Sequence, residues 1–267
     1  MTDGGLPLSR TGRRPMEVAT QAIKEAGVIV AEHFGAPQKA TLKGRGNLVT
    51  EVDLLAEKAI LGLLRSEYPE HCIISEESDA VTTESPYTWI VDPLDGTNNY
   101  SFGLPFVSVT LALVRGEDIL LGLTFDPLRQ ELFRAEKGKG AFLNDAPMAV
   151  SPRTDLQRSA LGCDLGYDAE KGAQTLDFVR SLWPGMHSLR IMGSGALGLA
   201  YVASGRLEIY LHRFLYPWDV AGGILLIREA GGLVTDWQGV PVTTDSGEVV
   251  CANPVLHGQI MARIAPR

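Results

Sequence analysis

The sequence has few cysteines, no excess of positive charge and no long apolar run. Its three cysteines, Cys72, Cys163 and Cys251, are far apart and form no Cys-x-x-Cys pair, so neither a disulfide framework nor a zinc site is expected. Aspartate and glutamate outnumber lysine and arginine by 32 to 24, and the formal net charge of −8 argues against nucleic acid as a partner. No stretch approaches the length of a membrane span. These absences predict a cytoplasmic protein that binds neither nucleic acid nor a membrane.

The 267 residues, 45% of them hydrophobic, suffice for one large or two modest domains. Before Ser151, two amphipathic helical patterns are followed by strand-length apolar runs. After it, strands and helices alternate, with a helix expected near residues 169–182 and strands at 233–235 and 249–252. We therefore expect an N-terminal α+β domain, residues 1–150, with two helices on an antiparallel sheet, and a C-terminal α/β domain, residues 151–267.

Three features near the N-terminus have a structural interpretation. Residues 1–14 are expected to form a flexible leader ahead of the first helix. The basic loop at residues 43–46 contains two glycines, so it is either a solvated turn or a mobile lid over an anionic ligand. Thr50 and Asp53 have the spacing of a helix-capping arrangement, which favours a structural role for Asp53.

The most informative stretch is an apolar run that ends in two aspartates, Asp92 and Asp95, separated by Pro93 and Leu94. Pro93 fixes its own φ and favours an extended Asp92, while Gly96 permits backbone geometry that other residues resist. Both carboxylates can then point at one spot, with the Leu94 carbonyl between them. Such an oxygen-only set suits Mg²⁺. The same residue types are common in ordinary turns, so this motif alone does not establish a metal site.

Further acidic residues strengthen the metal hypothesis. Glu76 and Glu77 follow a strand-like run, and Asp219 stands at the start of a helix, where it would be a good N-cap. The glycine pair at residues 222–223 weakens that helix, so close approach of another element or of a ligand is expected there. Another helix opens at the Gly-x-Gly turn of residues 193–196, whose amides could meet an anion or whose glycines could serve close packing.

Three motifs, in this order, resemble the inositol monophosphatase family: Glu76-Glu-Ser78, Asp92-Pro-Leu-Asp-Gly-Thr97 and Trp218-Asp-Val-Ala-Gly222. Similar segments run through most of the chain, at Asn47-Leu-Val-Thr-x-x-Asp53, Gly140-Ala-Phe-x-Asn144 and Glu229-Ala-Gly-Gly232. Three matches at long separation are more specific than any one motif. The resemblance implies a mixed α/β (α+β) fold, a layered αβαβα sandwich with the site between its halves. It also implies a Mg²⁺-dependent, lithium-sensitive phosphoric monoester hydrolase that forms a homodimer.

The resemblance further implies two or three Mg²⁺ ions. Glu76, Asp92 and the Leu94 carbonyl would hold one ion. Asp92, Asp95 and Asp219 would hold a second, so that Asp92 bridges the two.

Catalytic and substrate-binding roles are implied in the same way. Thr97 and Glu76 would orient the attacking water, and Asp53 would support this pair. Contacts to the small phosphorylated substrate would come from Asp95, Gly96, Thr97, Gly193, Ser194, Gly195, Ala196 and His212.

His212 departs from the family pattern, because the inositol-specific members have at this position a glutamate that contacts sugar hydroxyls. Inositol 1-phosphate is the first expected substrate. Fructose 1,6-bisphosphate, histidinol phosphate, adenosine 3′,5′-bisphosphate and NADP, on which related members act, are the alternatives. A hypothesis of another class is a regulatory protein that acts on transcription and has incidental phosphatase activity.

Overall fold

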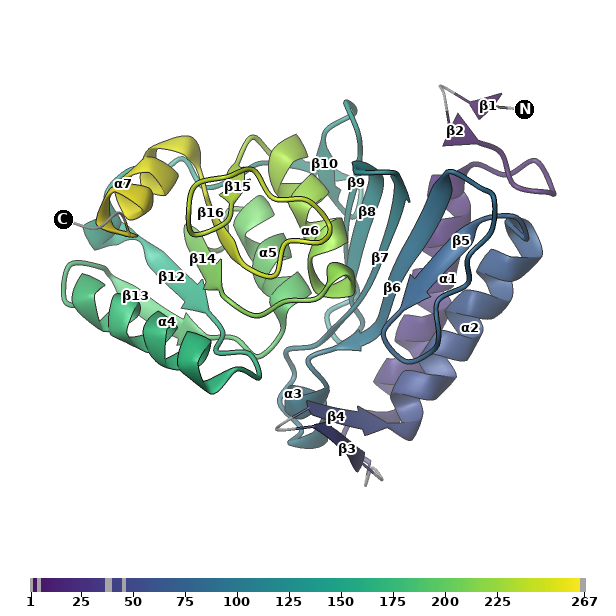
Figure 1. Ribbon diagram of the computed structural model, residues 1–267, viewed down its shortest axis with the longest axis horizontal. Helices are drawn as coiled ribbons and strands as arrows, with labels where there is room; N and C mark the ends of the chain where they lie inside the picture. Colours follow the sequence, from purple (N-terminus) through teal and green to yellow (C-terminus); the bar gives the residue numbers. More distant parts are fainter. Residues whose placement is uncertain (1, 4–5, 37–39, 45–46, 265–267) are drawn as a thin grey trace.

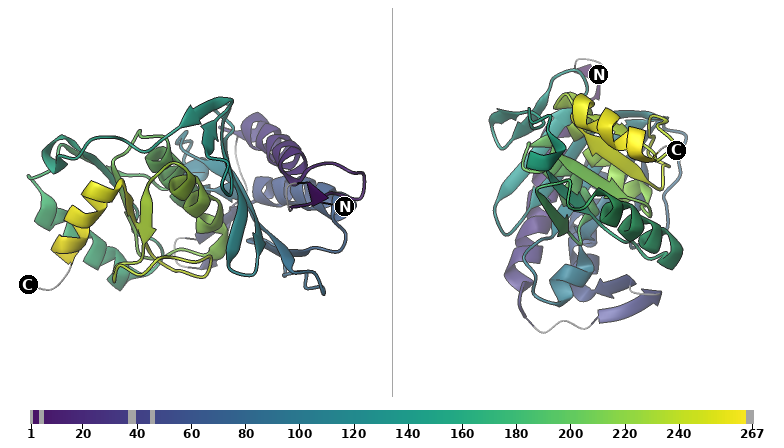
Figure 2. Two further views of the ribbon diagram at one scale, coloured as in Figure 1. Left: turned by 90° about the horizontal axis from the view of Figure 1, so that it is seen from above. Right: turned by 90° about the vertical axis from the view of Figure 1, so that its left-hand side faces the viewer.

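The computed structural model describes residues 2–3, 6–36, 40–44 and 47–264, which form five layers in the order helices, sheet, helices, sheet, helices (Figure 1). The left view of Figure 2, seen from above, shows the same layering. The expected layered αβαβα sandwich is thereby confirmed. From one outer face to the other, the helices are α1 (Pro15–His33), α2 (Glu51–Glu67), α5 (Gly195–Ala203), α6 (Pro217–Glu229), α4 (Ala169–Leu182) and α7 (Pro254–Ile264).

The first sheet has seven strands in the order β11-β10-β9-β8-β7-β6-β5. Neighbouring strands are antiparallel except β5 and β6, which are parallel, so the expected antiparallel sheet is wrong for this pair. Residues 76–86 return the chain to the end of the sheet where β5 began, and such a return allows parallel pairing. The strands are β5 (Cys72–Ser75), β6 (Tyr87–Asp95), β7 (Ser108–Arg115), β8 (Asp118–Asp126), β9 (Glu131–Glu136), β10 (Ala141–Leu143) and β11 (Ala146–Met148).

The second sheet has five strands in the order β13-β12-β14-β16-β15. Its strand β12 is parallel to both β13 and β14, whereas β16 is antiparallel to its two neighbours. Residues that follow β12 and β14 therefore emerge at the same edge of the sheet. The strands are β12 (Ala160–Cys163), β13 (Ser188–Ile191), β14 (Ile209–His212), β15 (Leu233–Thr235) and β16 (Val249–Ala252).

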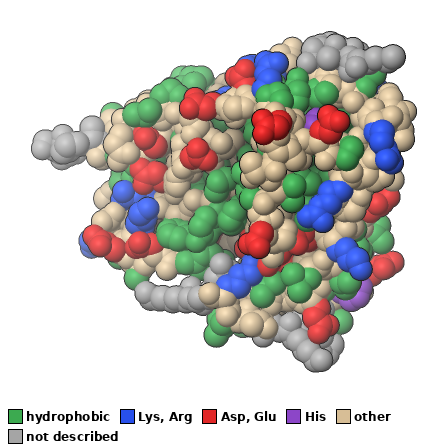
Figure 3. Space-filling view, turned by 45° about the vertical axis from the view of Figure 1, so that its right-hand side comes forward, with side chains coloured by type: hydrophobic (Ala, Val, Ile, Leu, Met, Phe, Trp, Pro, Cys, Tyr) green, Lys and Arg blue, Asp and Glu red, His purple; other side chains and the backbone are tan. Residues whose placement is uncertain are grey.

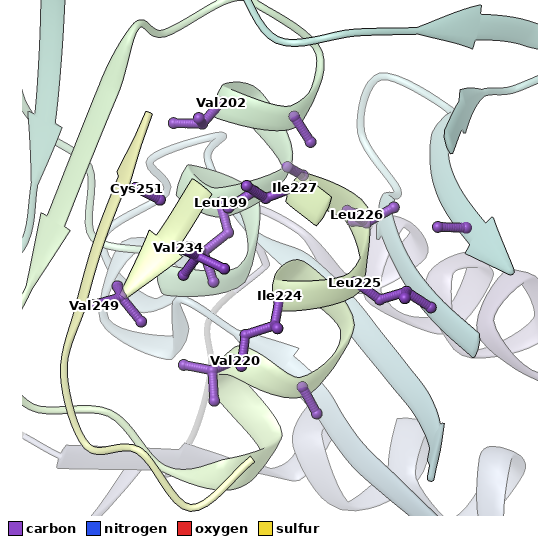
Figure 4. Close-up of a cluster of buried hydrophobic side chains, with 14 of the residues drawn as sticks. Leu199, Val202, Val220, Ile224, Leu225, Leu226, Ile227, Val234, Val249 and Cys251 are labelled. Atoms are coloured by element: carbon purple, nitrogen blue, oxygen red, sulfur yellow. The ribbon is translucent and has the colours of Figure 1, made fainter. Parts of the chain in front are cut away.

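The middle helices α5 and α6 hold the two sheets together through a shared apolar core (Figure 4). Leu199 of α5 and Ile224 of α6 lie in this core with Val249 and Cys251 of the second sheet. Helix α6 approaches the first sheet so closely that a Cβ added at Gly122 of β8 would collide with the Gly222 carbonyl. The expectation of a close approach at the glycine pair of α6 is thereby confirmed.

The short elements correct one expectation about the N-terminus. Within the described residues, 6–14 are not a flexible leader, because the Arg10 amide donates to the Glu67 carbonyl and the Thr11 hydroxyl to the Glu67 carboxylate. Met1 and residues 4–5 lie outside the described residues. The short elements are β1 (Thr2–Asp3), β2 (Leu6–Pro7), β3 (Ala40–Gly44), β4 (Asn47–Thr50), α3 (Thr97–Ser101) and a 3₁₀ turn (Leu156–Arg158). Among the described helices, none has the length and apolar character needed to cross a membrane.

Candidate active site

Three carboxylates from two separate parts of the chain converge in one pocket. Asp92 and Asp95 lie at the end of β6, and Asp219 lies in the first turn of α6. One oxygen of each lies within 4.8 Å of the others. Glu76 directly follows β5 and lines the same pocket, because the parallel pairing of β5 with β6 brings their carboxyl ends to one edge.

Crowding and burial make this cluster unfavourable for negative charge. Burial raises the pKa of Asp92, and the charges of Glu76, Asp95 and Asp219 raise it further. The pKa values of Asp95 and Asp219 are also raised, first by burial. Burial raises the pKa of Glu76 to about 7. A site of this kind favours the binding of cations, which would keep all of these groups ionised.

Thr97 and Asp53 form a buried pair beside the cluster. Helix α3 begins at Thr97, after Gly96 with its φ of 90°, and the Thr97 hydroxyl lies 3.0 Å from Asp53 Oδ1. The other carboxylate oxygen, Asp53 Oδ2, accepts the Thr50 amide at 2.9 Å and the Thr50 hydroxyl at 2.5 Å. Asp53 therefore caps α2, as its spacing predicted, and also contacts Thr97.

Asp219 does not occupy the N-cap position expected for it. Helix α6 starts at Pro217, so Tyr216 is the N-cap and Asp219 is the third helical residue. Its Oδ2 accepts the Tyr216 amide at 2.7 Å, as in a capping box. Because Pro217 has no amide hydrogen and suits the first helical position, the helix begins three residues earlier than expected.

The Gly-x-Gly turn lines the pocket, but the amides of Gly193, Gly195 and Ala196 already have acceptors in the protein. The amides of Gly195 and Ala196 donate to Asp95 at 3.1 and 3.0 Å, and the Ser194 hydroxyl donates to the same carboxylate. The Gly193 amide donates to Asp164 at 2.5 Å. Contact of this turn with phosphate or substrate hydroxyls stays a prediction, and it requires these hydrogen bonds to be exchanged.

Lys43 and Gly44, the described part of the basic loop, end strand β3, which pairs with β4. Lys43 Nζ lies 3.5 Å from Glu76 Oε1 and forms an ion pair with Glu77. Burial acts to lower the Lys43 pKa, but the hydrogen bond to Glu77 and the neighbouring acids raise it overall. The Lys43 side chain therefore places a positive charge beside the acidic cluster. Residues 45–46, the rest of the predicted lid, lie outside the described residues.

Two pocket residues near His212 were missed by reasoning from the sequence. Asp164 follows β12, and burial raises its pKa to about 6. An acid directly after a strand was a usable signal, the same one that singled out Glu76 and Asp92. Tyr167 also lines the pocket and carried no such signal. His212 ends β14 in the pocket wall, where burial lowers its pKa to about 3 and its Nδ1 accepts the Phe214 amide at 3.0 Å.

The outer surface of the site combines charge with apolar side chains. Figure 3 shows acidic side chains meeting a basic one in a hollow, with hydrophobic side chains gathered beside it. The apolar and aromatic residues that line the pocket are Leu165, Tyr167, Ile191, Phe214, Leu215, Tyr216 and Trp218. The pocket therefore has a carboxylate floor and a partly apolar wall.

Known proteins match the chain over nearly its whole length. The profile of the Inositol monophosphatase family matches residues 13–266. Inositol monophosphatase 1 of Solanum lycopersicum is 40% identical over 247 residues, which are 90% of this chain and 90% of that protein. Nus factor SuhB of Pasteurella multocida is 37% identical over 257 residues, which are 94% of this chain and 96% of that protein. The crystal structure of extragenic suppressor protein suhB from Bartonella henselae has a TM-score of 0.89 at 34% identity and covers 94% of this chain and 98% of that one.

The layered fold and these relatives define the protein as a phosphoric monoester hydrolase. The chain belongs to the inositol monophosphatase family. The resemblance carried by the three acidic motifs is thereby confirmed.

Proposed function

We propose that the protein hydrolyses a small phosphate monoester with the help of Mg²⁺, and that inositol 1-phosphate is the first substrate to test. The observation that carries this proposal is the convergence of Asp92, Asp95 and Asp219 within 4.8 Å. A buried set of like charges needs cations to stay ionised, and its oxygen-only composition fits Mg²⁺.

Two or three ions are part of the proposal. Glu76, Asp92 and the Leu94 carbonyl would hold one ion, and Asp92, Asp95 and Asp219 would hold another. When bound, the ions would neutralise the phosphate oxygens, promote deprotonation of water and stabilise the leaving alkoxide.

Thr97 and Glu76 orient the attacking water. The single hydroxyl proton of Thr97 has two possible acceptors, Asp53 Oδ1 and the Leu94 carbonyl, both at 3.0 Å. With its proton donated to one of them, the Thr97 oxygen can accept a hydrogen bond from water. The Glu76 carboxylate accepts the second hydrogen bond that the water donates. The water oxygen then forms the new bond to phosphorus while its proton passes to Glu76, the bond from phosphorus to the alcohol oxygen breaks, and the leaving alkoxide takes a proton from solvent water.

Contacts to the substrate are assigned to both halves of the pocket. The amides of Gly96 and Thr97 at the start of α3 donate hydrogen bonds to phosphate oxygens. Amides of the Gly193–Ala196 turn also donate to the substrate once they give up their present hydrogen bonds within the protein. Asp95 and His212 face the alcohol. Neutral His212 replaces the charged glutamate of inositol-specific members, so the alternatives remain fructose 1,6-bisphosphate, histidinol phosphate, adenosine 3′,5′-bisphosphate and NADP.

Several further properties belong to the same proposal. Lithium inhibits the enzyme, the protein forms a homodimer, and it acts in the cytoplasm. Residues 1–150 and 151–267 are the two domains, and the pocket draws on both. Family membership supports the first two properties.

The test is phosphate release from inositol 1-phosphate and the four alternative substrates, with Mg²⁺ and with a chelator. Mg²⁺-dependent release from inositol 1-phosphate above the others supports the full proposal. A preference for another ester would change the proposed substrate but would still support Mg²⁺-dependent hydrolysis. An enzyme that releases phosphate equally well after complete metal removal would contradict the metal assignment.

A second candidate is a regulatory role in transcription with incidental phosphatase activity. Its support is the name Nus factor, which the Pasteurella multocida relative carries. The test is affinity capture from lysate with the wild-type chain and with Asp92→Asn. Capture of transcription proteins by both, together with low turnover on every ester, favours regulation, and high turnover with no such capture contradicts it.

A further inference from the structure

The short turn between β13 and α5, residues 192–194, is anchored in the second sheet by Asp164. Asp164 Oδ1 accepts the amides of Met192 at 2.9 Å and Gly193 at 2.5 Å. Its other oxygen, Oδ2, accepts the hydroxyl of Tyr210 in β14 at 2.6 Å. Asp164 is 6% exposed and Tyr210 is 0% exposed, so these hydrogen bonds form away from water. The position of the turn is thereby tied to strands β12 and β14.

The other end of the turn holds the Asp95 carboxylate. The Ser194 hydroxyl and the Ala196 amide donate to Asp95 Oδ2, and the Gly195 amide donates to Oδ1 at 3.1 Å. The Ser108 hydroxyl also donates to Oδ2, at 3.1 Å. Among the described residues, three donors thus reach Oδ2 and one reaches Oδ1, so Oδ1 keeps more lone-pair capacity for an ion. The orientation of Asp95 therefore depends on where the turn lies.

The turn has little room to shift without Asp95. Gly193 has a φ of 77°, and a Cβ there would stand 2.6 Å from Asn99 Oδ1. Asn99 Nδ2 donates to the Met192 carbonyl at 2.9 Å. A Cβ at Gly96, the residue after Asp95, would stand 3.0 Å from the Gly193 carbonyl oxygen. Because packing this close transmits displacement, a turn released at one end would move the carboxylate at the other.

We infer that Asp164 is a positioning residue, which acts through the turn to direct the Asp95 carboxylate toward one of the proposed ions. That ion is the one that Asp92, Asp95 and Asp219 would hold. The inference rests on the proposed function, because it concerns the geometry of this metal site. Asp164 is not itself a proposed ligand. Residues that orient metal ligands through hydrogen bonds typically cost about ten- to a hundredfold in metal affinity or activity when they are lost.

The experiment titrates the metal-free protein with Mn²⁺, which accepts the same oxygen ligands as Mg²⁺ and is detected by electron paramagnetic resonance. Asp95→Asn identifies the binding event that depends on this carboxylate. Asp164→Ala removes the acceptor of the Gly193 amide, so we expect it to weaken the same event by about tenfold. Asp164→Asn removes the charge but keeps a side-chain oxygen for the amides, and its new N–H can donate to the Tyr210 hydroxyl. This conservative variant should retain most of the affinity.

Glu208→Ala is the matched control for the loss of a buried, hydrogen-bonded carboxylate. Glu208 lies next to β14 and is 1% exposed. It accepts the Ser151 hydroxyl at 2.9 Å, and Arg153 Nη1 and the Ala160 amide at 2.7 Å each. Its side chain does not line the pocket. Glu208→Ala should lower the melting temperature, as Asp164→Ala should, but it should leave both Mn²⁺ affinities unchanged.

Tyr210→Phe provides the test if Asp164→Ala does not fold. It removes only the hydroxyl that holds Asp164 Oδ2, so the Asp95-dependent event should weaken by a smaller factor. Unchanged Mn²⁺ binding in the variants of Asp164 and Tyr210 would overturn the inference, while binding by the wild type would uphold the metal assignment.

Two further results would also overturn the inference. Equal weakening in Asp164→Asn and Asp164→Ala would assign the effect to charge, and equal weakening in Glu208→Ala would assign it to general loss of stability. A wild-type protein that binds no Mn²⁺ would instead contradict the proposed function itself.

Discussion

At the scale of single residues, two carboxylates that stabilise helix starts also belong to the proposed catalytic site. Asp53 closes the first turn of α2 through Thr50 and receives the Thr97 hydroxyl at 3.0 Å. Asp219 closes the first turn of α6 and contributes an oxygen to the acidic cluster. Because each group is tied to a helix start, its position follows from the helix and needs little additional ordering.

The Thr97 hydroxyl is the group to test in the pair with Asp53. Thr97→Val keeps the shape but removes the oxygen, so we expect kcat to fall by about a hundredfold or more. Thr97→Ser restores a hydroxyl and should retain most of the activity. Steady-state kinetics with both variants checks this, and equal activity of Thr97→Val and the wild type would contradict the assigned role.

Asp92→Asn should affect activity and stability in opposite directions. Turnover should fall by about a hundredfold, because the proposed shared metal ligand loses its charge. Without metal the variant should melt at a higher temperature than the wild type, since one of several buried like charges is gone. Calorimetry of the metal-free proteins and phosphate release measure the two effects. Asp118→Asn, a surface aspartate paired with Lys137, is the matched control and should leave turnover unchanged.

At the scale of secondary-structure elements, strand direction and helix approach place the site. The parallel pair of β5 and β6 sets Glu76 beside Asp92, since the Glu76 amide donates to the Val91 carbonyl at 3.2 Å. Helix α6 brings Asp219 to the site because Gly222 lets the helix lie directly on β7 and β8. A Cβ at Gly222 would stand 2.9 Å from Thr110 Oγ1 and 3.2 Å from the Leu123 carbonyl.

Two glycine substitutions test this approach. Gly122→Ala should push α6 off the sheet, lowering both stability and turnover, because Asp219 moves with the helix. Gly62→Ala is the matched control within α2, where a Cβ meets nothing within 4 Å. It should stabilise the protein by about 0.5–1 kcal/mol, since alanine restricts the unfolded chain and favours the helix. Chemical denaturation and kinetics measure both, and unchanged turnover in Gly122→Ala would contradict the proposed coupling.

At the scale of the whole molecule, the acidic cluster links metal binding to folding. The cluster is assembled only when both sheets and the middle helices are in place, so we expect the proposed Mg²⁺ to bind the folded chain in preference to the unfolded one. At a free concentration of about one hundred times Kd, the free energy of unfolding should rise by about 2.7 kcal/mol. Thermal denaturation with Mg²⁺ and with a chelator measures this, and Asp92→Asn should show a smaller shift.

The stabilisation by Mg²⁺ should also depend on pH. The folded-state pKa of Glu76 is raised to about 7, so its protonation stabilises the metal-free protein at low pH, and this contribution is lost as pH rises through about 7. Protons thus compete with the metal, and the melting shift caused by Mg²⁺ should be larger at about pH 8 than at about pH 6. Comparison with and without metal at each pH isolates this effect from other titrating groups. A shift independent of pH would contradict it.

Much of the fold could be predicted from local patterns. The helix expected near residues 169–182 and the strands at 233–235 and 249–252 coincide with α4, β15 and β16. The wrong predictions concern segments whose structure depends on residues far away in the sequence. The direction of β5 depends on how the chain returns after it, and residues 6–14 are ordered by Glu67, a contact that no local pattern signals.

The sequence by itself determined the features that depend on neighbouring residues. Examples are the Thr50–Asp53 capping box, the Asp92–Thr97 motif and the family to which the motifs belong. The first two depend on contacts between residues a few positions apart in the chain, and the family is recognised from the residue types and order of the motifs, so all three can be predicted without the tertiary structure.

Only the tertiary structure decided which groups face the pocket and what they contact there. In the folded chain, the amides of Gly195 and Ala196 donate to Asp95. The Tyr210 hydroxyl donates to Asp164, and Tyr167 lines the same pocket as the carboxylates. These contacts join residues far apart in the chain. They exist because burial of the apolar faces of α5 and α6 presses the two sheets together.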